Sequence, residues 1–376
     1  MRASLSVALL LAMVPALAQS PPETAGEPVE ASAPETATAE VATTDTPEIT
    51  PDIAMLDQVL VTGEQPGPGL WKITKDGNAL WILGTYGPLP KKMTWRSREV
   101  ESIIAESQRV VRWVEIDTDV DVGFFAGLSA LPLVFTAGNN PDGAKLKDVV
   151  PPEAYEQYQT LKAKYDERSN GKEKLRPAFA ALELRDKASN ESGLSSAPVI
   201  WPTVERLAKR HKVKILQPKV KMEIKIDNPR AMIKKFRKTQ MADVECFTET
   251  ITRLETDLET MKARANAWSI GKLDVLKKIP PPDAKFDCGQ MLQNLFLNGN
   301  LAEEIGAKEM MDRTLKDMER VMKEQDATWL RTVEESLRDH ASTFALMPIS
   351  KLLDAKGPLQ TLRDSGYEVD EPVIAP

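Results

Sequence analysis

Two apolar runs within residues 70–84 limit the fold more than any other feature of the sequence. They are rich in Leu, Trp and Ile, and they flank Asp76-Gly77, a dipeptide that favours a tight hairpin turn. We therefore predict a hairpin with strands at 70–75 and 79–84.

The chain that follows this hairpin predicts an α/β fold. Residues 97–108 have apolar side chains at helical spacing, and the β-branched run at 109–117 predicts another strand. The order strand, strand, helix, strand is typical of an α/β domain. Near the other end, residues 342–353 and 357–369 predict a strand, a turn, a helix and a final short strand. We expect a helix-rich single α/β domain around a central sheet formed by N- and C-terminal strands.

The middle of the chain is predicted to be mostly helical. From Pro229 a long amphipathic helix carries apolar residues at alternating steps of three and four, and this stripe favours core packing over a cofactor or partner site. The stripe consists of Val244, Phe247, Ile251, Leu254, Leu258 and Met261. The other predicted elements are helices at 152–167, 177–190, 200–211 and 289–297, a longer pair of helices covering about 301–340, and one strand at 213–224.

The first residues have the pattern of a signal peptide. Arg2 precedes an apolar run from Leu5 to Val14, and the small residues Ala16 and Ala18 follow. The run is about half the ~20 residues that a membrane-spanning helix needs. We expect cleavage after Ala18 and a periplasmic or secreted protein without a transmembrane segment, although this signal does not distinguish the two locations.

Residues 19–64 form an acidic leader of Pro, Ala, Thr and Glu with ten acidic residues and no Lys or Arg. Such a composition cannot bury enough apolar surface to fold, so we expect a disordered region. The formal net charge of -7 comes from this leader, and the remainder carries about +2. The low overall pI therefore says little about the folded domain, which we assign to residues 65–376.

Cys246 and Cys288 are the two cysteines of the chain. In an exported protein a disulfide bond is the expected state of such a pair, and two free buried thiols are the alternative. A disulfide closing a loop of this length stabilises the fold by roughly 4 kcal/mol on the chain-entropy model.

Both ends of the predicted domain also carry a family signature. The opening reads LWKI and LWILGTYGPLP, followed by Trp95, a helix and RVVRWVEID, and the closing reads TFALMPISKLL and GPLQTLRDSGYEV. Together they resemble the TraB/GumN (TraB/PrgY) family, relatives of the Tiki proteases. The similarity extends over residues from about 70 to 370 and is firmest at the two ends.

The resemblance implies a metal-dependent peptidase with two Gly-x-x-His motifs and a glutamate at the end of a strand. Neutral imidazoles would ligate a divalent metal that activates water, and the carboxylate would act as ligand or base. On this chain the first motif falls on Gly84 to Gly87, so its histidine is replaced by glycine. The second falls on 347–350 and ends in Ser350, whereas the glutamate is present as Glu115.

The family's metal site should therefore not form in this chain, and we expect no metal and no cofactor. Glycine has no ligating side chain, and a serine hydroxyl is a poor ligand compared with imidazole. The only histidines, His211 and His340, lie outside both motifs, where surface or helix-end positions are expected. We also expect Glu115 and Asp117 to point to opposite faces of their strand and not to form a paired acid and base.

Residues 205–238 contain thirteen Lys or Arg and three acidic residues. If several share a face, they would attract an anionic envelope component such as lipid head groups or acidic polysaccharide; the alternative is a solvated surface. Nucleic acid is not expected, because no recognition motif or aromatic series accompanies the charges. The anion-binding candidates are Lys209, Arg210, Lys212, Lys214, Lys219, Lys221, Lys234, Lys235, Arg237 and Lys238.

These observations favour a non-catalytic binding or regulatory protein of the cell envelope, a pseudo-peptidase that keeps a cleft for a peptide or glycan. The first alternative is a hydrolase with a metal-dependent or rearranged site built on Glu115, Tyr86 and Ser350. The second is a structural envelope protein that binds anionic lipid or polysaccharide through its basic surface. The sequence alone identifies neither the ligand nor the oligomeric state.

Overall fold

The computed structural model describes residues 63–65, 67–91, 93–95, 97–134, 136–167, 173–195, 197–282, 288, 291–292 and 301–372. The predicted signal peptide, nearly all of the acidic leader and most of the predicted helix at 289–297 lie outside these residues. Gly63 and Glu64, which the sequence assigns to the leader, belong instead to strand β1 (Gly63–Gln65), which pairs with β5 (Met93–Trp95). No helix in the described ranges is long and apolar enough to cross a membrane.

A six-stranded mixed sheet forms the centre of the α/β fold, in the order β12-β2-β3-β11-β6-β9. The predicted hairpin is confirmed, and Asp76 and Gly77 form its turn with positive φ angles of 53° and 83°. The C-terminal β11 lies between β3 and β6 and is parallel to both, which confirms a sheet built from both ends of the chain. The strands are β2 (Leu70–Lys75), β3 (Asn78–Thr85), β6 (Arg109–Val111), β9 (Lys214–Leu216), β11 (Ser342–Pro348) and β12 (Glu368–Asp370).

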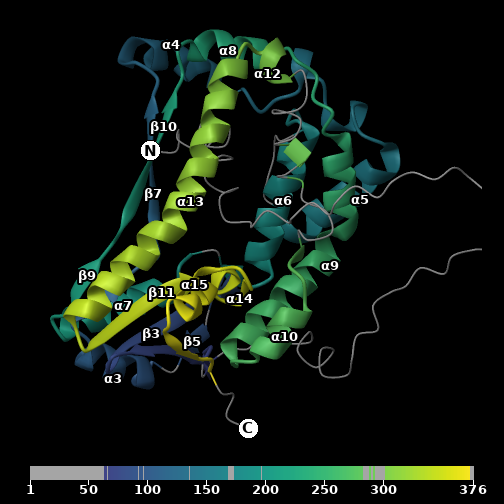
Figure 1. The fold of residues 1–376 in the computed structure, drawn as a ribbon. Coiled ribbons are helices and arrows are strands. Elements are labelled where there is room, and N and C mark those ends of the chain that lie inside the picture. Colours follow the sequence, from purple (N-terminus) through teal and green to yellow (C-terminus); the bar gives the residue numbers. More distant parts are fainter. Residues whose placement is uncertain are drawn as a thin grey trace, which may run out of the picture.

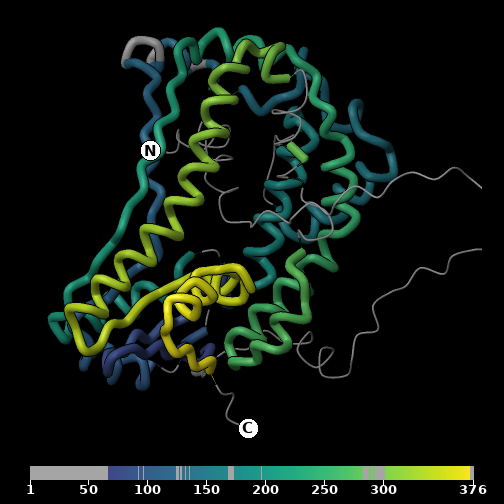
Figure 2. Tube along the Cα trace, viewed as in Figure 1, coloured from purple at the N-terminus to yellow at the C-terminus, as the bar shows by residue number. Residues whose placement is uncertain are grey.

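Helices from distant parts of the sequence cover this sheet. α3 (Arg98–Glu106) packs against α7 (Ile200–Arg210), and α13 (Lys308–Asp339) reaches the sheet at its C-terminal end (Figure 1). α14 (Ile349–Leu353) and α15 (Pro358–Asp364) follow β11. Figure 2 shows the purple early strands and the yellow C-terminal segment side by side in this part of the molecule.

Two of the predicted strands each divide into two, and this corrects the sequence analysis. The strand predicted at 109–117 becomes β6 and β7 (Glu115–Asp121), and the one predicted at 213–224 becomes β9 and β10 (Lys219–Lys225). β7 and β10 pair in parallel as a separate two-stranded ribbon. Both breaks lie side by side, because Arg112 N donates to Leu216 O at 2.9 Å and Glu115 N donates to Pro218 O at 3.0 Å.

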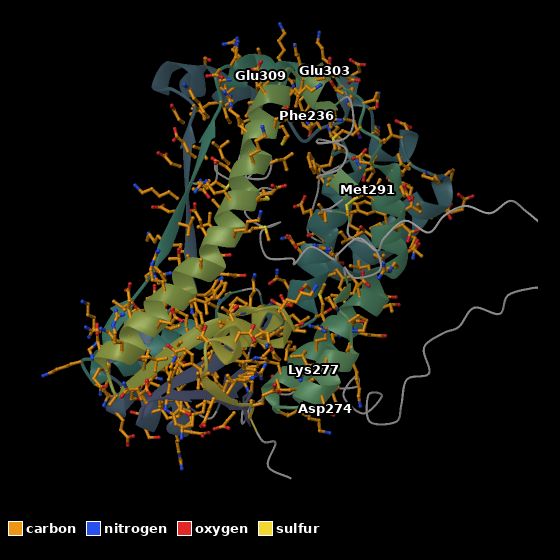
Figure 3. All side chains as sticks on the ribbon, in the orientation of Figure 1. Phe236, Asp274, Lys277, Met291, Glu303 and Glu309 are labelled. Carbon is orange, nitrogen blue, oxygen red and sulfur yellow. A yellow bond between two sulfur atoms is a disulfide. The ribbon has the colours of Figure 1, made fainter. Side chains whose placement is uncertain are left out.

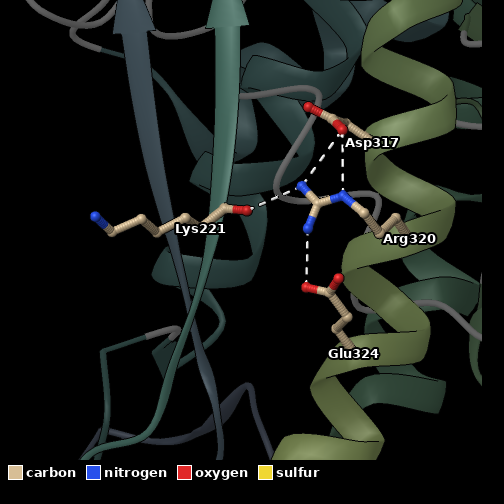
Figure 4. A network of polar contacts seen from close by, with 4 residues as sticks. All are labelled: Lys221, Asp317, Arg320 and Glu324. Atoms are coloured by element: carbon tan, nitrogen blue, oxygen red, sulfur yellow. Dashed lines mark hydrogen bonds and ion pairs between the residues drawn. The ribbon is translucent and has the colours of Figure 1, made fainter.

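The β7–β10 ribbon is buried on one face only. Val220, Met222 and Ile224 are buried and their strand packs against α13, whereas alternate residues are exposed. Arg320 of α13 fastens the helix to the ribbon, because its Nη2 donates to the carbonyl oxygen of Lys221 at 3.2 Å (Figure 4). Alternating burial of this kind is expected of a ribbon with one face in water.

A second group of helices lies across the molecule from α13 and the β7–β10 ribbon (Figure 1). It consists of α5 (Pro152–Tyr165), α6 (Pro177–Glu191), α9 (Val244–Ser269) and α10 (Leu273–Lys278). The predicted core stripe of α9 is confirmed. Phe247, Ile251, Leu254 and Leu258 are buried against α5 and α6, while Val244 and Met261 are partly buried. Such packing is the ordinary way in which a long amphipathic helix buries its apolar face.

The long helix predicted from Pro229 is wrong, because α8 (Pro229–Phe236) ends before α9 begins. The buried guanidinium of Arg176 explains the break. It donates to Phe236 O at 2.6 Å and to Thr239 O at 2.9 Å, which satisfies carbonyl groups that a continuous helix would bond internally. The Asp243 carboxylate, which lies before α9, accepts from Ala178 N at 3.0 Å.

The remaining elements are short. α4 (Phe124–Val134), which the sequence analysis did not predict, contacts α8, and α12 (Leu301–Glu304) precedes α13 as expected. Cys246 and Cys288 are buried at disulfide distance, with Cα atoms 5.2 Å apart. The other short elements are β4 (Leu89–Pro90), β8 (Leu194–Ser195) and 3-10 turns at Pro141–Gly143 and Leu146–Asp148.

Candidate functional site

The carboxyl ends of β3, β6 and β11 lie at one edge of the central sheet. These strands are parallel neighbours, with Met347 opposite Gly84 and Val111 opposite Ala345. In open α/β sheets, ligands bind outside the carboxyl ends of the strands. The two degenerate motifs both lie at this edge, so we call it the motif edge and take it as the candidate functional site.

Gly84, the glycine that the first motif retains, has a packing role. A Cβ atom at this position would lie 2.5 Å from Ile349 Cδ1 and 3.2 Å from the Trp71 ring. Its carbonyl oxygen also accepts a hydrogen bond of 3.0 Å from Trp268 Nε1 of α9. The absence of a side chain therefore allows α14 to approach the end of β3 closely.

The two positions where the motifs would carry histidine are both exposed. Gly87 follows β3 and precedes Pro88 through a cis peptide bond, and a Cβ atom built on it would meet nothing within 4 Å. Ser350 lies in α14, one residue after the buried Ile349. Neither position supplies a strong ligand for a divalent metal.

Glu115 lies at the first position of β7, where it is exposed and 3.6 Å from Lys219 Nζ. The expectation that Glu115 and Asp117 point to opposite faces is wrong. Side chains two residues apart on a strand share a face, and both carboxylates lie on the exposed face of the ribbon. In the parallel register Lys219 is opposite Glu115, Lys221 is opposite Asp117 and Lys225 is opposite Asp121, which gives a charge ladder with one like-charged pair, Asp119 and Glu223.

Tyr86, the third residue of the first motif, contacts an arginine of α9. Arg264 of α9 donates through Nε to the Tyr86 hydroxyl at 3.3 Å, and its guanidinium also donates to the carbonyl oxygens of Leu276 and Ile279. Burial raises the pKa of Tyr86 above its usual value, although Arg264 acts in the opposite direction. Tyr86 is therefore a neutral hydroxyl group at ordinary pH and not an anionic base.

The residue that follows the second motif, Lys351, forms an ion pair with α13. Lys351 Nζ of α14 is 2.9 Å from Asp326 Oδ2 of α13, and the two side chains are 23% and 33% exposed. The other carboxylate oxygen of Asp326 is buried without a hydrogen bond to the described residues. The preceding residue, Gln325, donates to Val114 O at 2.9 Å, which ties α13 to the break between β6 and β7.

A divalent metal does not fit these side chains. No group of three or more His, Cys, Asp or Glu in the described ranges is arranged to hold a metal ion. His211 is at the end of α7, where its Nε2 lies 3.3 Å from Glu101 Oε1, and His340 follows α13. Hydrogen bonds from Arg210 and His211 lower the pKa of Glu101, so these groups form a surface cluster.

A comparison with known protein families gives a match over most of the chain. Residues 69–371 match the TraB/PrgY/gumN family. The chain belongs to this family. No curated protein and no solved structure matches it significantly. Membership confirms the resemblance seen at the two ends of the domain and extends it through the helical middle.

The ten basic candidates do not share one face in the structure. Four of them lie at the end of α7, in the turn that follows and at the start of β9, near the central sheet (Figure 1): Lys209, Arg210, Lys212 and Lys214. Lys209 pairs with Glu205 at 2.8 Å and Arg210 with Glu101 at 2.6 Å. Lys219 and Lys221 lie on the ribbon, and the other four, Lys234, Lys235, Arg237 and Lys238, lie in or directly after α8 at the far end of the molecule.

The polar groups that surround the motif edge were not found from the sequence. Arg264 is 178 residues from Tyr86, and Asp326 is 25 residues from Lys351. Single charged residues on predicted helices carry no signal of such distant partners. The aromatic pair of Trp113 and Trp329, with ring centroids 5.8 Å apart, was missed for the same reason.

Proposed function

We propose that this protein is a non-catalytic member of the TraB/PrgY/gumN family, exported to the cell envelope, which binds a peptide or glycan without cleaving it. The observation that carries the proposal is the chemistry of the two motif positions. They hold Gly87 and Ser350, both exposed, where the resemblance implies imidazole ligands.

The surroundings of these positions support binding over hydrolysis. Glu115, the carboxylate that the resemblance assigns to the site, lies in the charge ladder of the ribbon beside Lys219. Tyr86 is held by Arg264, and Lys351 is paired with Asp326. Hydrogen-bonding groups remain at the edge, whereas the neutral imidazoles that would hold a metal and activate water are missing.

Metal content gives the first test of this proposal. Protein purified without chelator should contain far less than one equivalent of zinc, manganese or cobalt by mass spectrometry of the elements. Peptide hydrolysis should also be absent with these metals added. One equivalent of bound metal, or hydrolysis that Glu115→Ala abolishes, would favour the hydrolase alternative and contradict the proposal.

Restoring the two histidines gives a sharper test. Gly87→His fits sterically, because open space surrounds the Cβ position, and Ser350→His replaces an exposed side chain. If the two positions still face a common cleft, the double variant should gain zinc binding that neither single variant has. The double Gln variant at the same positions is the control for side-chain size. A folded double His variant without added zinc affinity would show that the cleft has been lost.

Export is tested separately. N-terminal sequencing of the protein from its native host should give Gln19 as the first residue, and the full-length chain in the cytoplasmic fraction would contradict the exported location.

A further inference from the structure

α4, α8 and α12 lie together at the end of the molecule farthest from the central sheet (Figure 1). We call α4, α8 and the two residues Arg237 and Lys238 the α4–α8 tip. α4 lies on α8, because Ala130 and Val134 share a buried cluster with Ile233 and Phe236. Arg230 also donates from Nη1 to Ser129 O at 3.3 Å. The two helices therefore form one surface unit.

α4 brings an uncharged segment with an exposed apolar side chain to this unit. Its sequence, FFAGLSALPLV, contains no charged residue. Leu131 is 46% exposed, and it is the only large hydrophobic side chain with such exposure in the part of the chain that the structure describes. Leu131 is thus an exposed apolar side chain on an uncharged helix that contacts the basic helix α8.

α8 brings a concentrated positive charge beside that segment. From Pro229 to Lys238 there are five Lys or Arg and no acidic residue. Its apolar residues Ile233 and Phe236 are buried, whereas Arg230, Lys234, Lys235 and Lys238 are exposed. The helix thus has an inward apolar face and an outward basic face.

Acidic groups also lie near this end and reduce the net charge. Glu303 and Glu309 are labelled in Figure 3 close to Phe236, and Asp227 precedes α8. Two of them have basic neighbours outside α8, because Glu303 pairs with Lys308 at 3.7 Å and Asp227 with Arg313 at 3.6 Å. Glu304 and Asp312 are exposed on the same segment, so acidic residues border α8, whereas the stretch from Pro229 to Lys238 itself carries only positive charge.

We infer that the α4–α8 tip docks the protein peripherally on an anionic lipid bilayer. Lys and Arg near such a surface are attracted to acidic head groups, and an adjacent apolar side chain gains by entering the boundary between head groups and acyl chains. The exposed leucine selects a bilayer over a soluble polyanion, because a polysaccharide or nucleotide offers no apolar layer. This inference does not rest on the proposed lack of catalysis, since no residue of the tip belongs to the motif edge.

Docking at the tip would hold the motif edge away from the membrane. α13 begins beside α12 at the tip and ends at the central sheet, and its 32 residues correspond to about 48 Å of helix. The ribbon runs alongside this helix and is fastened to it through Arg320. The motif edge would thus be presented to soluble material at a distance from the lipid surface.

Vesicle co-sedimentation tests the proposal with the purified protein. Vesicles of phosphatidylcholine with about 30% phosphatidylglycerol should bind the protein at about 50 mM NaCl, and binding should weaken at about 500 mM NaCl. Vesicles of phosphatidylcholine alone should bind far less. Absence of binding to the anionic vesicles at low salt would overturn the proposal.

Two matched double variants test the location of the surface. Lys234→Gln with Lys235→Gln should weaken binding by about 30-fold. Lys212→Gln with Lys214→Gln makes the same change in net charge near the central sheet and should leave binding within about twofold, because that site is more than a Debye length from the tip. Equal losses in the two variants would overturn the assignment to the tip. Thermal unfolding of each variant confirms that it is folded.

Leu131→Gln distinguishes a bilayer from other anions. It removes no charge, and it should weaken vesicle binding about fivefold through lost apolar burial. If Leu131→Gln binds vesicles as well as the unchanged protein while the lysine variant does not, the tip binds anionic groups without entering the bilayer, and the lipid-docking proposal is wrong.

Discussion

The same two stretches of chain form β6 and β9 in the central sheet and then β7 and β10 in the ribbon, and the two strand pairs are stabilised differently. Val110 and Val111 of β6 are buried in the sheet. From Glu115 onward exposed acidic residues alternate with the partly buried Ile116, Thr118 and Val120. The sheet is therefore stabilised by packing on both faces. The ribbon is stabilised by α13 on its buried face and by cross-strand charge pairs on its exposed face.

This difference separates two tasks within one fold. The sheet fixes the relative positions of the strand ends that carry the family motifs, and close packing around Gly84 keeps α14 against β3. The ribbon and α13 connect that edge to the α4–α8 tip. Variants in the two regions should consequently differ in how strongly they affect stability.

Phe344→Ala should give the largest effect. Phe344 is fully buried in β11, opposite Trp81 of β3 and Val110 of β6. The cavity and the lost transfer free energy should lower the free energy of unfolding by about 3–5 kcal/mol, measured by urea denaturation. Ile224→Ala, on the inner face of the ribbon, should cost about 2 kcal/mol because the ribbon is buried on one face only. Equal losses would show that the ribbon is packed as closely as the sheet.

Gly84→Ala tests the close approach at the motif edge. The added methyl group would overlap Ile349 Cδ1 and press on Leu352 Cδ1 at 3.1 Å. Because both are ends of flexible side chains, the expected loss of unfolding free energy is about 2 kcal/mol. Gly87→Ala is the matched control, since a Cβ there meets nothing within 4 Å, and its effect should stay below about 0.5 kcal/mol. Similar values for the two variants would contradict the packing role of Gly84.

Gln325→Leu tests the junction between sheet and ribbon. Its side-chain amide donates to Val114 O, and its loss should leave a buried carbonyl group without that partner. We expect the free energy of unfolding to fall by about 1–2 kcal/mol. Thr332→Val on the same helix is the control, because its hydroxyl donates to Thr328 O within α13 itself. No difference between the two variants would indicate that the junction is held by other contacts.

The comparison also explains which parts of the fold could be predicted. The hairpin around Asp76 and Gly77 and the buried strand β11 follow from local turn chemistry and apolar runs. The breaks at 112–114 and 217–218 were missed, although the sequence carries a signal for them. At Glu115 and at Lys219 the pattern changes from a continuous apolar run to strict alternation, which marks a change from a two-sided to a one-sided strand.

The candidate site was predictable only in part, because its residues come together through tertiary structure. The motif positions Gly84, Gly87 and Ser350 followed from family order and spacing. The contact of Arg264 with Tyr86 depends on how α9 packs against the sheet, which no local pattern encodes. At the tip, the uncharged stretch Phe124–Val134 was a readable signal for a short helix, but its neighbour α8 is about a hundred residues later in the chain.

The smallest predicted effect concerns Glu115 and Lys219, which lie at the start of the ribbon. Their atoms are 3.6 Å apart and each side chain is 48% exposed, so solvent screens the interaction. A double-mutant cycle with Glu115→Ala and Lys219→Ala should give a coupling energy of about 0.5 kcal/mol or less that decreases with added salt. Such a result would fit a carboxylate that has become part of a solvated charge ladder. A coupling well above about 1 kcal/mol that is insensitive to salt would instead require a desolvated pair. Glu115 would then belong with the closely packed motif edge, and the division between sheet and ribbon would have to be moved beyond it.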